Sequence, residues 1–230
     1  MRRSAKEQVE PASGWLFNAI ANKHAEAMDN FPRPNVLPRE EDDEALAQAL
    51  GSILPVILQQ EDFEEVYDRV MDDKLKGGTG IYGVFWDPEK LGGLGDIAIS
   101  RVDVLNLYWE SGITDLQQSR NLFYLRMEDN DRLLEAYPQL EGKLTGEADG
   151  GQKPQTEDRV DTTDKTTVID WYYKKSQQGR SVLHYCKFVG DTVLFATENS
   201  PDYRDRGWYD HGLYPFVMDP LFRTAGSPCG

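Results

Sequence analysis

The chain has 230 residues, which is enough to bury a hydrophobic core as one domain or as two closely joined parts. Its 40 acidic residues outnumber 25 basic ones, and the net charge of −15 argues against an electrostatic grip on nucleic acid. Two cysteines are too few for a disulfide framework or a zinc site, so a reducing, cytoplasmic setting is expected. Nowhere do about 18 apolar residues run together, and we therefore expect a soluble protein with no membrane segment.

The first part of the chain, residues 1–78, is predicted to be an N-terminal helical segment. A first helix over residues 15–28 follows from the helical spacing of its apolar residues. The next residues, "NFPRPNVLPRE", hold three prolines and predict an extended connector. A second helix is expected from near Glu40, where "EEDDE" is interpreted as an acidic helix start rather than a metal site. Pro55 lies within its apolar stripe, and we expect a kink or a break there.

The glycine pattern Gly78-x-Gly80-x-x-Gly83 has the spacing of a dinucleotide-binding fingerprint. In that fingerprint a strand runs into the glycines and a helix leaves them. Here a charged amphipathic helix precedes the glycines and a strand, residues 81–86, follows them. Gly77 and Gly78 therefore predict a helix C-cap, and the helix end would present carbonyls to a phosphate. We predict that no nucleotide or other cofactor binds there.

Residues 79–140 form a first β-rich part with a short helix stopped by Pro138. Its strands are predicted at 81–86, 97–108 and 121–127, and the short connections make them antiparallel. Residues 141–165 contain no aromatic residue and almost no apolar one, which predicts a mobile acidic and polar loop.

Residues 166–230 form a second β part, predicted as a meander. Its strands are expected at 166–174, 182–189 and 192–197, with Gly190-Asp191 as the hairpin turn between the last two. The tail shows no capped element, so the chain looks cut short. The fold class predicted for the whole chain is α+β: N-terminal helices followed by mostly antiparallel sheet.

Candidates for catalysis are few. The chain has three histidines, His24, His184 and His211, and none lies in a recognisable motif. His184 and Cys186 share a strand face and could pair a thiol with an imidazole, although a packed face explains them better. Asp202, Asp205, Asp210 and His211 match no metal-ligand spacing. We predict no catalytic, cofactor-binding or metal-binding residue, and no enzyme activity.

Aromatic residues are more informative, since the chain has five tryptophans and eleven tyrosines. Aromatic side chains on strands fill cores and are also enriched at protein interfaces, and the sequence leaves both roles open. The candidates for a subunit interface are Trp86, Trp171, Tyr173 and Tyr214.

The order of several segments is more informative about the protein family than the composition is. The connector "FPRPNVLP", with Asn18, Asn22, Lys23 and Asp29 before it, precedes a glycine-rich step into Trp86-Asp87-Pro88. Gly95-Asp96-Ile97 opens the next strand, and the stretch from Asp115 to Arg126 follows. Further segments come in the order "TTVIDWYYKK", "GDTVLFATENSP" and "HGLYPFVMDPLF". This ordered set, which covers nearly the whole chain, resembles the portal proteins of tailed bacteriophages.

The resemblance implies a subunit of a homo-oligomeric ring, usually a dodecamer, at one vertex of the phage capsid. It implies as partners the large subunit of the terminase, a head-tail adaptor, and capsid and scaffold proteins. Double-stranded DNA would pass through the ring without tight binding. The protein would belong to the virion, and to the host cytoplasm during assembly.

The chain would correspond to the wing of a portal subunit and would end before the stem. Two alternatives remain open, namely a non-enzymatic module for protein binding or assembly and, less favoured, a nucleotide-binding enzyme.

Overall fold

The computed structural model describes residues 14–144, 164–177, 179–223 and 225–229. The chain divides into two compact units, Met1–Pro55 and Val56–Gly230. Most of the predicted mobile loop, residues 145–163, lies outside the described residues.

The N-terminal helices are α1, Trp15–Asp29, and α2, Glu44–Gln60, which a 3₁₀ turn at Glu41–Asp43 introduces. Residues 31–38 between them form neither helix nor strand, as the three prolines predict. We expected a kink or a break at Pro55, and the break is excluded because α2 continues through this residue, whereas a kink stays a prediction. A proline forfeits one helical hydrogen bond, and the helix tolerates that loss. The break lies at Asp62, whose φ of 46° is left-handed and cannot continue a right-handed helix.

Helix α3, Phe63–Gly77, has Glu64 and Glu65 in its first turn and lysines in its last, so its charges complement the helix dipole. It buries Val70 and Met71 and ends at Gly78, whose φ of 84° and N–H bond to the Lys74 carbonyl form the predicted C-cap. Strand β1, Thr79–Asp87, leaves directly from this cap. The predicted order of helix, glycines and strand is therefore confirmed.

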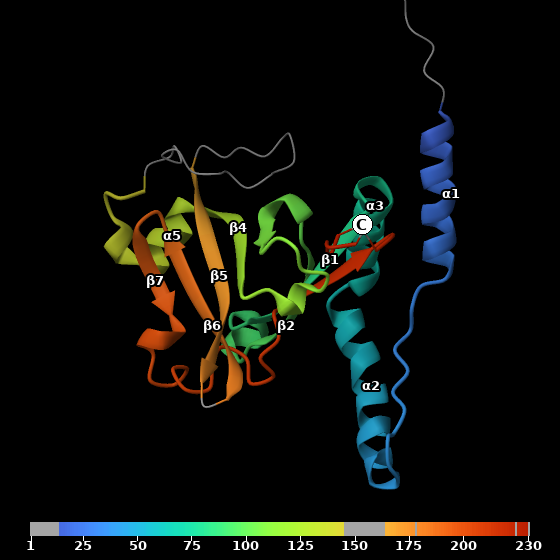
Figure 1. Ribbon diagram of the computed structural model, residues 1–230, viewed down its shortest axis with the longest axis horizontal. Coiled ribbons are helices and arrows are strands. Elements are labelled where there is room, and N and C mark those ends of the chain that lie inside the picture. Colours follow the sequence, from blue (N-terminus) through green and yellow to red (C-terminus); the bar gives the residue numbers. More distant parts are fainter. Residues whose placement is uncertain (1–13, 145–163, 178, 224, 230) are drawn as a thin grey trace, which may run out of the picture. The chain divides into compact units, whose positions relative to one another are not determined.

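Two antiparallel sheets follow, and they confirm the α+β class (Figure 1). Sheet A has the order β2-β1-β8, where β2 is Asp96–Arg101 and β8 is Phe216–Pro220. Sheet B has the order β3-β4-β5-β6-β7 and is a meander, as expected for its last three strands. Its strands are Leu107–Trp109, Asn121–Asp129, Lys165–Gln177, Arg180–Val189 and Thr192–Ala196. Two short helices, α4 at Lys90–Gly93 and α5 at Asn130–Ala136, lie between strands.

The structure differs from the strands predicted from the sequence in two places. The single strand predicted at 97–108 is two strands in different sheets, because Asp103 accepts a hydrogen bond from the Leu105 N–H and starts a 3₁₀ turn. The tail, in which no strand was predicted, contains β8, which pairs with β1 along Thr79–Gly83. A pairing between strands so distant in sequence leaves no local signal.

Ion pairs connect helix α3 to both edge strands of sheet A. Lys74 bonds Asp219 of β8 at 2.8 Å, and Arg101 of β2 makes a bidentate ion pair with Asp73. These contacts hold the helix across the central strand β1.

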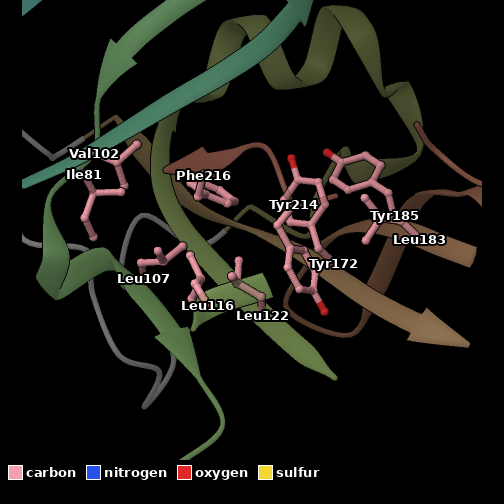
Figure 2. Close-up of a cluster of buried hydrophobic side chains, with 10 residues drawn as sticks. All are labelled: Ile81, Val102, Leu107, Leu116, Leu122, Tyr172, Leu183, Tyr185, Tyr214 and Phe216. Atoms are coloured by element: carbon pink, nitrogen blue, oxygen red, sulfur yellow. The ribbon is translucent and has the colours of Figure 1, made fainter. Parts of the chain in front are cut away.

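One hydrophobic core joins the two sheets. Figure 2 shows Phe216 of β8 lying between the pair Ile81 and Val102 and the ring of Tyr214. Phe216 also meets Tyr172 of sheet B edge-on, with ring centroids 5.6 Å apart. The strand that the sequence missed therefore supplies a central side chain of the core. A second, smaller cluster packs Leu133 and Leu140 beneath Val168 and Val189.

Candidate functional site

A cleft of about 660 Å³ opens between the end of β1 and one face of sheet B. Residues 85–89 of β1 and the following turn form one side, and residues 124–129 of β4 form another. Helix α5, strands β2, β5 and β6, and residues 208 and 209 complete the lining. The volume lies within the range of about 300–1,000 Å³ that is typical of binding pockets.

The floor of the cleft is a buried polar network centred on Asp170 of β5. Its carboxylate, only 4% exposed, accepts from Arg126 Nε at 2.6 Å and from the Tyr185 hydroxyl at 2.5 Å. Burial and the Asp170 charge raise the pKa of Tyr185. Burial alone would lower the pKa of Arg126, but the carboxylates of Asp170 and Glu128 raise it overall. These shifts favour a charged Arg126 guanidinium and a neutral Tyr185 hydroxyl.

The other charges of the cleft extend this network outward. Arg126 Nη1 lies 2.9 Å from Glu128, and Lys187 reaches the same Glu128 oxygen at 3.3 Å while lying over the Tyr137 ring. Of the side chains that line the cleft, five are acidic and three are basic. Both cations of the floor are neutralised, so the remaining charge of the cleft is negative.

Aromatic rings form the rest of the lining. Trp208 stacks on Tyr185 with centroids 4.7 Å apart. Trp86 lines the cleft and is 54% exposed. A Cβ at Gly95 would meet the Trp86 indole at 2.6 Å, so the indole rests directly on the glycine backbone. The cleft thus combines a rigid polar floor with fixed aromatic walls and an acidic excess.

The structure separates the four residues predicted for a subunit interface. Trp171 and Tyr173 lie together on β5 with rings stacked 4.3 Å apart, and the Tyr173 hydroxyl bonds Glu198. Tyr214 is buried, donates to the Ser119 carbonyl at 2.8 Å and carries Lys174 over its ring. Only Trp86 is mainly exposed. The interface role stays a prediction for all four, and burial within the chain gives Tyr173 and Tyr214 a core role as well.

His184 and Cys186 are both buried on β6. Thr197 Oγ1 donates to the Tyr185 carbonyl, which assigns the His184 proton to Nδ1, 3.1 Å from that hydroxyl. Nε2 then accepts from the Gln177 amide at 3.0 Å. Burial lowers the pKa of His184 and raises that of the Cys186 thiol, so it favours the neutral form of both groups. This pattern fits the packed strand face better than a reactive pair.

Gly80 and Gly83 of the fingerprint lie where neighbouring atoms leave no room for a side chain. A Cβ at Gly80 would lie 2.5 Å from the Val70 side chain and 2.7 Å from the Val70 carbonyl of α3, and one at Gly83 would strike Phe85. Among the described residues no group of three His, Cys, Asp or Glu could hold a metal ion.

The N-terminal helices α1 and α2 expose apolar side chains. Helix α1 has no buried residue, and the side chains of Trp15, Leu16 and Phe17 are each more than 70% exposed. Helix α2 buries only Ala47 and exposes Leu46, Leu50, Ile53 and Val56. Contiguous exposed apolar residues are typical of an interaction surface.

A family model described as "Phage P22-like portal protein" matches residues 25–211, a span that includes the whole cleft and the extended segment before α2. The chain belongs to this portal protein family. The family is one of structural rather than catalytic proteins. No curated protein matches the chain. The helices among the described residues of this portal family member are too short or too polar to cross a bilayer.

The sequence missed the network of Asp170, Arg126 and Tyr185. A signal was present, because Asp170 is the one acidic residue in the apolar and aromatic run "VIDWYY" and alternates with Val168 and Tyr172 on the buried face of β5. A buried acid at such a position requires a partner. Its partners come from β4 and β6, and only the pairing of the strands identifies them.

Proposed function

We propose that the chain is the subunit of a closed homo-oligomeric portal ring through which phage DNA enters and leaves the capsid. The observation that carries the proposal is the match to the portal family over residues 25–211. The ring would stand at one vertex of the capsid and, as in the resemblance above, would contain about twelve copies.

The division of the chain into two units supports this proposal. Residues 56–230 have a core that joins both sheets, and this unit can serve as a rigid body of the ring. The N-terminal helices α1 and α2 instead expose apolar residues. Surfaces of this kind become buried when subunits associate.

The proposed partners are those of a portal. The large subunit of the terminase and a head-tail adaptor would dock on the ring, and capsid and scaffold proteins would surround it. We assign the chain no reaction of its own, and we place it in the virion after assembly in the host cytoplasm. The net charge of −15 fits a passage that DNA crosses without being held.

The test is to determine the mass and particle shape of the complete gene product by native mass spectrometry and electron microscopy. We expect closed rings, and we expect phage that lack the gene to form heads without DNA. A stable monomer or dimer at high concentration, together with normal DNA packaging after deletion, would contradict the proposal. If the protein formed complexes of fixed stoichiometry with a partner protein but no ring, the result would instead support the alternative of a protein-binding module.

A further inference from the structure

The connector between α1 and α2, residues 30–40, exposes most of its side chains. It forms neither helix nor strand over 31–38, and every residue from 30 to 40 except Phe31 and Val36 is exposed. Leu37 is 75% exposed, and Arg33 and Arg39 are exposed on either side of it. The segment therefore offers solvent an apolar side chain, three prolines and two positive charges.

The prolines restrict the backbone of this segment to conformations suited to binding. Each proline fixes its own φ near −65° and disfavours helical backbone at the residue before it, which here affects Phe31, Arg33 and Leu37. Such segments favour the polyproline II conformation, lose little entropy on binding and dock in grooves lined by aromatic rings.

The cleft has the complementary chemistry. Its aromatic lining includes Trp86, Tyr137, Trp208 and Tyr209, and its acidic side chains outnumber its basic ones. Within the described part of the chain, the Trp86 indole N–H makes no hydrogen bond and can donate to a peptide carbonyl. Glu89, which lines the cleft and is exposed, forms no ion pair with another described residue.

We propose that the connector of one subunit docks in the cleft of a neighbouring copy, with its prolines against Trp86 and its arginines at the acidic rim near Glu89. This inference rests on the proposed ring. Connector and cleft are different surfaces of the same chain, and a closed ring is built from such head-to-tail contacts. Every copy supplies one of each, so all connectors and all clefts are filled when the ring closes.

The first test uses cross-linking between differently tagged copies of the full chain. One copy carries Leu37→Cys and the other carries Glu89→Cys, and Cys229→Ser is present in both. Under mild oxidation we expect a disulfide-linked product that contains both tags. The matched control replaces Glu89→Cys by Asp202→Cys, which lies in an exposed turn that does not line the cleft, and should give little product. Equal yields from the two mixtures would overturn the inference.

The second test uses charge reversal, with association measured by sedimentation velocity at low salt. The double change Arg33→Glu and Arg39→Glu should weaken association about fivefold or more, and Glu89→Arg alone should do the same. A chain carrying all three changes should recover much of the loss. Arg69→Glu, on the exposed surface of α3, is the control and should have little effect. Wild-type association in both reversal variants would contradict the docking.

The two proposals can fail separately. Rings in which the Leu37–Glu89 cross-link is absent and Trp86→Ala leaves association unchanged would disprove connector docking and leave the portal function standing. A mixed-tag cross-link without any ring would support the docking contact and count against the portal ring.

Discussion

At the scale of single residues, Asp170 shows how a buried charge is held in this fold. Its carboxylate lies beneath sheet B and depends on the Arg126 guanidinium and the Tyr185 hydroxyl. Removing one partner of a buried ion pair leaves an uncompensated charge, which is more damaging than removing the pair.

We therefore expect Arg126→Leu to lower the free energy of unfolding by about 3 kcal/mol, the lower end for a buried pair because the arginine side chain is 38% exposed. Urea denaturation measures the change. The triple variant Arg126→Leu, Asp170→Leu and Tyr185→Phe removes the whole network and should lose less than the single variant. A triple variant that is less stable than Arg126→Leu would show that the network itself stabilises the fold.

His184 predicts a pH dependence of stability. Burial lowers its folded-state pKa, with Glu198 opposing and Lys175 adding to the effect, so the folded protein binds a proton less readily than the unfolded chain. Its contribution to stability is complete above the unfolded pKa of about 6.5 and is lost as the pH falls from there through the folded pKa.

The urea midpoint of the wild type should therefore fall between pH 7.5 and 5.5 more steeply than that of His184→Gln, which cannot titrate. Nearby Glu198, Lys175 and Tyr173 are present in both proteins and cancel in the comparison. Parallel pH profiles would show that His184 titrates normally in the fold.

Gly80 tests the packing interpretation of the glycine fingerprint. A methyl group there would press against the Val70 carbonyl, which is helix backbone and cannot turn aside. Gly80→Ala should destabilise the protein by about 1–3 kcal/mol. Gly77→Ala, where a Cβ meets nothing within 4 Å, is the control and should be close to neutral. Equal thermal stability of the two variants would contradict the close approach of α3 and β1.

At the scale of elements, the turn between α2 and α3 covers the outer edge of strand β2 in sheet A. Glu61, whose side chain is 8% exposed, binds Lys90 at 2.5 Å and accepts from the Ile99 N–H of β2, while Lys90 donates to the Ile97 carbonyl. The two side chains occupy backbone groups that an added strand would otherwise use.

Glu61→Ala should therefore open this edge. Hydrogen exchange, followed by mass spectrometry, should speed up in peptides covering residues 96–101 while sheet B keeps its protection. Glu65→Ala breaks only an exposed pair with Arg69 on α3 and serves as the control. Unchanged exchange in the Glu61 variant would show that the ion pair does not protect β2.

At the scale of the whole molecule, the charge predicts how the chain meets DNA. With a net charge of −15, the chain should not bind a labelled duplex at protein concentrations up to about 100 μM in physiological salt, where even non-specific DNA-binding proteins associate. Fluorescence anisotropy measures this directly. Binding that weakens steeply as salt is added would reveal a basic surface and argue against a passage that does not hold its cargo.

Elements with local signals were predictable from the sequence. Gly78 caps α3, Gly190 turns between β6 and β7, and Pro138 stops α5, because each signal acts on its own backbone. Pro55 shows the limit of such rules, since α2 continues past it, and the helical path ends instead before Asp62, a residue type that adopts left-handed backbone more readily than most.

The sequence by itself determined the α+β class, the order of helices and meander, the reversed glycine fingerprint and, through the order of its segments, the portal family. Only the tertiary structure decided that β8 joins β1, that Phe216 completes the core, and that Arg126 and Tyr185 partner Asp170. It also brought Trp86, Glu89 and the buried network to one cleft. The physical reason is that caps and turns depend on neighbouring residues, whereas pairing and burial depend on segments that only the folded chain brings together.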